Sequence, residues 1–142
     1  MSKFTQFMKG NKKKKENVKY APTASLVDEN GKPLEWEFRH ISTKENEDIR
    51  DECTTEVPVT GKYGAYRNKF NASGYVASLI VKSIIFPDLY DKELQDSYGV
   101  MKAEDLLMEM VDDPGEYSDL AEFVQKMQGF KALQEDVEEA KN

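Results

Sequence analysis

Residues 71–86, NASGYVASLIVKSIIF, decide the fold, because they hold the longest apolar stretch of the chain. Asn71 is a favourable residue type immediately before the first turn of a helix. The positions after it are apolar on most sides of such a helix: Tyr75, Val76, Leu79, Ile80 and Ile84. A helix that is apolar all round is buried. We therefore predict that a helix from Asn71 to about Ile85, stopped by Pro87, forms the centre of one domain.

Carboxylates, prolines and glycines crowd residues 86–120, just downstream of this helix. Their spacing is typical of helix boundaries: Asp88 or Asp91 caps a short helix, and Gly99 ends it. Apolar residues then recur every three or four positions, first at Ala103, Leu106, Leu107, Met110 and Val111, then at Tyr117, Leu120, Ala121, Val124 and Met127. This period predicts two amphipathic helices that cover the central one.

The second of these helices has the strongest start signal in the chain. In DPGE, residues 113–116, an N-cap aspartate precedes a proline at the first helical position, and Glu116 lies three residues past the cap. Gly129 closes the helix. Helix caps and solvent-exposed helix faces thus account for nearly all the carboxylates in this half of the chain.

Upstream, the hydrophobic period changes to two. Leu34, Trp36 and Phe38 alternate with polar residues, and Asn30-Gly31 is a strong turn signal between them and an earlier alternating stretch. These features predict a β-hairpin from about Val18 to Ile41. Pro22 in its first strand indicates that this strand lies at an edge or is bulged there.

A short helix and a second hairpin are predicted between the first hairpin and the central helix. Ser42 and Glu45 form a capping box for a helix from about Thr43 to Thr54, in which Ile49 and Cys53 are spaced to face the core. The stretch 57–70 then reads as a shorter hairpin that turns around residues 61–64. The pattern leaves open whether the two hairpins share one sheet.

The fold class that follows is α+β: a mostly helical single domain with an N-terminal β-hairpin and a second short hairpin. Its 142 residues suit one core. We expect three parts: a flexible basic segment (1–17), a globular domain (18–129) and an acidic C-terminal tail (130–142). Residues 1–20 carry a net charge of +6, whereas residues 88–142 carry −11. This imbalance is poorly suited to nucleic acid, because the acidic half repels phosphate.

The side chains that catalysis or metal binding would need are sparse. The acids of residues 88–99 miss the spacing of an EF-hand loop, and zinc needs three or four Cys or His ligands whereas the chain has only His40 and Cys53. Cys53 is predicted to be buried and inert, and His40 to lie at the rim of the core. We expect no enzyme activity, no cofactor and no metal. No apolar run is long enough to cross a membrane.

Six stretches resemble the XkdN-like tail assembly chaperones of tailed phages and phage-derived elements in Gram-positive bacteria. They are NKKKKENVKY (11–20), DENGKPLEWEFRHIS (28–42), DECT (51–54), FPDLYDKELQDSYGVMKAEDLL (86–107), GEYSDL (115–120) and VEEAKN (137–142). The likeness covers nearly the whole chain in the same order. It is weakest across residues 59–71, in the second hairpin, so no partner contact is carried over to that hairpin.

The resemblance implies a role in building a phage tail without enzymatic chemistry. A chaperone of this family is expected to bind the tape measure protein, keep it soluble and recruit tail tube subunits, then leave before the tail is finished. It would act in the host bacterial cytoplasm. We expect the contacts to come from apolar residues on the two terminal segments: Phe4, Phe7, Phe130, Leu133 and Val137. Self-association is a further option.

Three alternatives stay open at this point. The first is a structural tail completion or neck protein that remains in the virion. The second is a small enzyme whose only candidate pair is His40 and Cys53. The third is contact of Lys12–Lys15 with a nucleic acid backbone, although four lysines without interleaved aromatic residues are a weak signal.

Overall fold

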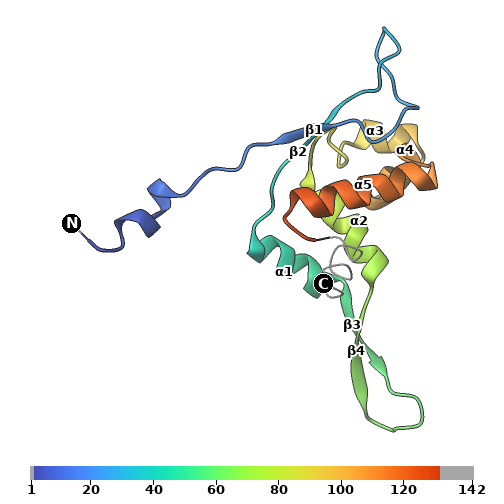
Figure 1. Cartoon of the computed structure of the whole chain (residues 1–142). Coiled ribbons are helices and arrows are strands. Elements are labelled where there is room, and N and C mark those ends of the chain that lie inside the picture. Colours follow the sequence, from blue (N-terminus) through green and yellow to red (C-terminus); the bar gives the residue numbers. More distant parts are fainter. Residues whose placement is uncertain (1, 132–142) are drawn as a thin grey trace, which may run out of the picture.

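The structure is a computed structural model that describes residues 2–131. The α-helices are α1 (Thr43–Glu52), α2 (Ala72–Ser83), α3 (Lys92–Ser97), α4 (Ala103–Met110) and α5 (Pro114–Met127). The strands are β1 (Val18–Tyr20), β2 (Trp36–Phe38), β3 (Thr54–Pro58), β4 (Tyr66–Phe70) and β5 (Ile84–Phe86). More of these residues are helical than extended, and both hairpins are present (Figure 1). The predicted α+β, mostly helical fold is confirmed.

Helix α2 is the centre of the domain, as its sequence predicts. Leu79 and Ile80 are fully buried, and α2 packs against α1, α4 and α5. The buried side chains around it come mainly from β2, α4 and α5: Trp36, Phe38, Leu106, Leu107, Leu120 and Val124. At about 25 cal/mol per Å² of apolar surface removed from water, side chains of this kind supply most of the stabilisation of the fold.

The end of α2 differs from the prediction. The helix stops at Ser83, and Ile84–Phe86 form strand β5, which pairs antiparallel with β2 through Phe38↔Ile84 and Glu37↔Phe86. The predicted continuation of the helix to about Ile85 is therefore wrong. A short apolar run does not distinguish a helix from a strand by period alone, and here pairing with β2 decides the outcome.

Strands β1, β2 and β5 form one three-stranded antiparallel sheet in that order. The first hairpin is confirmed, and β1 is an edge strand that ends two residues before Pro22. Aromatic rings attach this sheet to α5: the Tyr20 ring stacks on Phe123 with centroids 4.1 Å apart, and Phe38 meets Phe123 edge-on at 5.3 Å. Such ring pairs add about 0.5–1.5 kcal/mol beyond their buried area.

Glu116 ties the first hairpin to the start of α5. Its carboxylate accepts hydrogen bonds from the Thr23 hydroxyl and the Ala24 N–H, both at 2.7 Å. The prediction that Glu116 serves the N-terminus of its own helix misses this role. Asp113 alone supplies the side-chain cap, by accepting from the Gly115 N–H. These two hydrogen bonds lower the pKa of Glu116, and the bond from the Ala24 backbone has the larger effect.

The second hairpin, β3–β4, forms a separate two-stranded sheet, which answers whether the hairpins share one. It projects from the body beyond the end of α1 (Figure 1). Its turn needs positive φ at Gly61 (81°) and Gly64 (76°), which glycine adopts without steric cost. This is where the sequence places the turn.

Candidate partner-binding site

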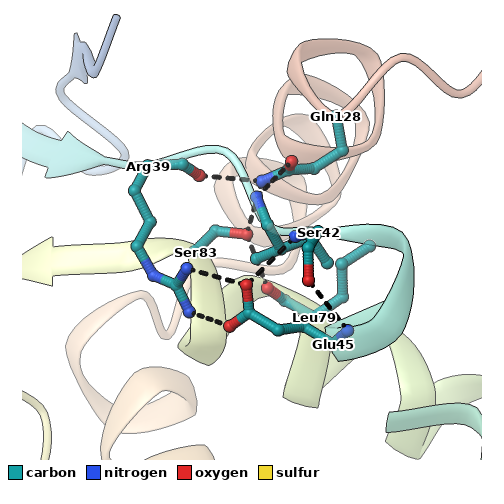
Figure 2. A network of polar contacts seen from close by, with 7 residues as sticks. Arg39, Ser42, Glu45, Leu79, Ser83 and Gln128 are labelled. Carbon is teal, nitrogen blue, oxygen red and sulfur yellow. Dashed lines mark hydrogen bonds and ion pairs between the residues drawn. The ribbon is translucent and has the colours of Figure 1, made fainter. Parts of the chain in front are cut away.

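The side-chain amide of Gln128 joins the end of α5 to the segment between β2 and α1 (Figure 2). Its Oε1 accepts from the Ile41 N–H at 3.0 Å, and its Nε2 donates to the Arg39 carbonyl at 2.9 Å. The same Nε2 lies 2.9 Å from the Ser83 hydroxyl, which itself donates to the Leu79 carbonyl at 2.7 Å. The one amide thus hydrogen-bonds to the Ile41 N–H and the Arg39 carbonyl, which have no partner in the sheet. We call this arrangement the Gln128 joint.

An ion pair lies on the other side of the same segment. Arg39 Nη2 and Nη1 contact the two carboxylate oxygens of Glu45 at 2.6 and 3.1 Å. Glu45 and Ser42 also form the predicted capping box at the start of α1. The pKa of Glu45 is lowered to about 2, mainly by the hydrogen bond from the Arg39 side chain and next by the hydrogen bond from the Ser42 backbone. The joint and the ion pair together fix the angle between β2 and α1.

A hollow of about 310 Å³ lies against the Gln128 joint, and we call it the joint hollow. It is lined by Lys15, Ile41, Ser42, Thr43, Asn46, Gln128 and Phe130. The structure therefore brings together the base of the N-terminal segment, the start of α1 and the first residue of the predicted tail. These parts lie far apart in the sequence, and one residue of each predicted terminal segment, Lys15 and Phe130, lines this hollow.

Phe130 is placed at the hollow by the way α5 ends. Gly129 has a φ of 91°, its N–H donates to the Lys126 carbonyl, and the Phe130 N–H donates to the Gln125 carbonyl. This is a Schellman motif, which turns the chain sharply after a helix. The Phe130 side chain is 41% exposed. The predicted contacts Leu133 and Val137 lie outside the described residues.

The N-terminal segment leads away from the body (Figure 1). Near its start the segment forms two short 3₁₀ turns, Thr5–Phe7 and Lys9–Asn11, and neither turn contains a buried residue. Phe4 is 63% exposed and Phe7 is 84% exposed. Two phenylalanines that lie so far in water are available to a partner.

The residues weighed for chemistry lie as follows. Cys53 is half-buried at the C-cap of α1, so the prediction of a buried helical position is wrong; the helix ends one residue before it because β3 begins at Thr54. His40 is half-buried beside the first hairpin, as predicted for the rim of the core. Residues 2–131 contain no cluster of three His, Cys, Asp or Glu side chains that could hold a metal, and no helix within that range is long and apolar enough to cross a membrane.

Comparison with known proteins identifies the family. Residues 4–141 match the model of the phage XkdN-like tail assembly chaperone protein family. The chain belongs to this family. It is 26% identical over 137 residues to the phage-like element PBSX protein XkdN of Bacillus subtilis strain 168, which covers 96% of this chain and 91% of that one. The resemblance read from residues 11–142 is therefore confirmed.

Two further comparisons concern YqbN of Bacillus subtilis strain 168. The chain is 25% identical to this uncharacterized protein over 134 residues, or 94% of this chain and 89% of that one. The crystal structure of the protein YqbN has a TM-score of 0.75 at 19% identity, covering 92% of this chain and 99% of that one. This structural likeness shows that the YqbN crystal structure has the fold described above.

Removing the Gln128 amide tests the joint. We expect Gln128→Ala to lower the free energy of unfolding by about 1–3 kcal/mol, because the Ile41 N–H and Arg39 carbonyl lose their partner in a partly buried place. Urea unfolding measures the change. Gln125→Ala is the matched control, since the Gln125 amide only donates to the Ala121 carbonyl of its own helix. Equal effects of the two substitutions would contradict the role given to Gln128.

The Arg39–Glu45 pair makes stability depend on pH. The folded pKa of Glu45, about 2, lies below the ordinary 4.5. The contribution of its charge is thus complete above about pH 4.5 and is lost as the pH falls toward 2. Glu45→Gln should cost about 0.5–1 kcal/mol at pH 7, the scale of a partly exposed ion pair.

The difference between wild type and Glu45→Gln should shrink as urea unfolding is repeated at pH 4, 3 and 2. The glutamine keeps one oxygen that can accept from the Ser42 N–H, and it removes the charge together with the second oxygen, which accepts from Arg39 Nη2. Glu47→Gln, on an exposed position of the same helix, controls for the change in net charge. A difference that stays constant down to pH 2 would show that the charge of Glu45 is not what stabilises the fold.

Proposed function

We propose that this tail assembly chaperone binds the tape measure protein, keeps it soluble and recruits tail tube subunits during tail assembly. The observation that carries the proposal is the match of residues 4–141 to the XkdN-like chaperone family. The family implies that the tape measure is a long helical protein whose apolar faces need cover before the tube surrounds it. The chaperone would act in the host bacterial cytoplasm and be absent from the finished virion.

The placement of the exposed aromatic residues supports this proposal. Phe130 lines the joint hollow. The segment that carries Phe4 and Phe7 joins the body near Lys15, which lines the same hollow. Ile41 and Phe130 give this hollow two apolar side chains among polar ones, and an amphipathic helix laid into a groove is bound by apolar contacts of this kind. We propose Phe4, Phe7 and Phe130 as contacts, and extend the proposal to Leu133 and Val137.

The charges of the chain support the solubilising part of the role. The joint hollow is lined by Lys15 and uncharged residues, whereas residues 88–142 carry −11. A partner helix bound at the hollow would therefore acquire a strongly acidic companion. Like-charge repulsion between such complexes opposes their aggregation, and added Asp and Glu favour solubility more than added Lys and Arg.

Co-expression with a tape measure protein from the same phage element tests the proposal. The wild type should increase the soluble fraction of the tape measure and co-elute with it. Phe4→Ser/Phe7→Ser should reduce the co-eluting amount several-fold, because hydrophobic anchors of this size dominate small interfaces. Phe86→Ser/Tyr90→Ser, at two other exposed aromatic residues, is the matched control. A tape measure that stays insoluble with the wild type would sink the proposal.

The departure of the chaperone is tested on finished particles. Mass spectrometry of purified tails should detect tube and tape measure peptides and no stoichiometric amount of this chain. The same measurement on assembly intermediates should detect it. Its presence in finished tails at a fixed ratio to the tube protein would instead indicate a structural component.

A further inference from the structure

The β3–β4 hairpin is almost uncovered. Every residue of β4 is exposed, and β3 is exposed at Thr55, Glu56 and Pro58. At the far end the Tyr63 side chain lies fully in water and Tyr66 is 64% exposed. Tyrosine and arginine are the residue types that most often carry binding energy at protein interfaces. Because this hairpin buries so few of its side chains, packing against the core does not explain why the hairpin is so long.

This hairpin is nevertheless held firmly at its base. The Asn71 N–H donates to the Cys53 carbonyl at 2.8 Å, and the Thr54 hydroxyl donates to the Arg50 carbonyl at 2.8 Å. The Arg50 guanidinium lies 4.9 Å from the centre of the Phe70 ring, a cation–π distance. The five residue pairs of the ladder keep one register from Thr54↔Phe70 to Pro58↔Tyr66. A rigid, projecting element loses little entropy on binding.

The tip and the base of the hairpin carry opposite charge. We call Lys62, Tyr63, Tyr66 and Arg67 the hairpin tip; it has two positive charges and no acid. At the base, a hollow of about 350 Å³ lies between the end of α1, the start of α2 and α4. Its charged lining is Glu52, Glu104 and Asp105 against Lys102, and Met108, 48% exposed, adds an apolar wall. We call it the root hollow.

The tip cannot reach the root hollow of its own chain. A five-residue strand spans about 17 Å, and the hairpin points away from the body (Figure 1). The two charge-complementary parts are thus held a hairpin's length apart on one rigid element. If two copies are placed with their hairpins antiparallel, each tip meets the other copy's root. An interface made of one self-complementary patch is what a two-fold dimer requires.

We propose that this hairpin joins two copies of the chain in a two-fold dimer, with the hairpin tip of each copy in the root hollow of the other. Lys62 and Arg67 face Glu104 and Asp105 across the interface, and the tyrosine rings contact Met108. A second hollow of about 660 Å³, lined by Thr55, Val57, Lys69 and Phe70 along the hairpin, accommodates the approaching partner hairpin. The proposal concerns the chaperone alone and does not depend on its binding of a tape measure.

Sedimentation velocity of the full chain over a concentration series tests the proposal. The wild type should move from monomer toward a mass twice that of the monomer, and 1 M salt should weaken the association. The tip variant Lys62→Glu/Arg67→Glu and the root variant Glu104→Lys/Asp105→Lys should each weaken it by at least about 100-fold, because every attractive charge pair becomes repulsive. Lys32→Glu/Lys44→Glu, with the same charge change as the tip variant at exposed positions elsewhere, should leave it unchanged.

Mixing the two disruptive variants gives the decisive result. In a heterodimer the reversed tip faces the reversed root, and the unchanged tip faces the unchanged root, so both contacts are attractive again. The mixture should therefore sediment as a dimer although neither variant does alone. This recovery cannot arise if the substitutions merely unfold the chain.

Three outcomes would overturn the proposal. They are a wild type that stays monomeric at 100 µM, a mixture that does not recover the dimer, and assemblies larger than two. A monomeric wild type whose tip binds a single-stranded oligonucleotide would assign the hairpin to nucleic acid instead. Tape measure solubility is read separately, so a failed dimer leaves the proposed function standing, and a failed solubility test leaves the dimer standing.

Discussion

The fold depends on hydrogen-bond partners for the backbone N–H and carbonyl groups between the end of β2 and the start of α1. Residues 39–41 leave the sheet before the helix begins, and backbone groups in such a place are costly unless they find partners. The Arg39 N–H pairs with the Ser83 carbonyl at the end of α2, and the Gln128 amide takes the Arg39 carbonyl and the Ile41 N–H. Three segments distant in sequence therefore meet at one side chain.

This constraint also explains where the candidate site lies. Because Gln128 is the C-cap of α5, the chain must turn there, and the Schellman motif directs Phe130 toward the start of α1. The N-terminal segment passes the same place at Lys15 on its way into β1. Lys15 and Phe130 therefore lie at the same hollow as a consequence of how the core closes.

Sequence reasoning succeeded where the signal was local. Hydrophobic periods, turn residues and helix caps together located both hairpins and every helix from α1 to α5, and Ser42, Asn71, Asp91 and Asp113 all cap helices as the sequence indicates. It failed where a distant partner decides. Ile84–Phe86 continue an apolar helix in sequence and become a strand only because β2 is there to pair with them.

The candidate site could be predicted from the sequence only where its signals were local. The exposure of Phe4 and Phe7 follows from their place in a short segment that runs directly into a block of lysines, which the sequence displays. Gln128 carries no signal, because a glutamine near a helix end is ordinary until its three partners are in place. Glu116 misled for a related reason: its position fits a capping box, but Thr23 and Ala24 offer its carboxylate two donors instead.

The division between a closed core and exposed aromatic side chains suits the proposed role, in which the chaperone binds and then leaves. The core side chains are buried without any partner, so the body does not need one in order to fold. The proposed binding through Phe4, Phe7 and Phe130 would therefore gain the free energy of its own contacts alone, reduced by the entropy lost when the segments that carry these residues become ordered. Interfaces built on a few anchors can be fast to dissociate, since affinity differences act mostly through the dissociation rate. A growing tail tube that covers the same apolar faces over a larger area would displace such a chaperone without any input of chemical energy.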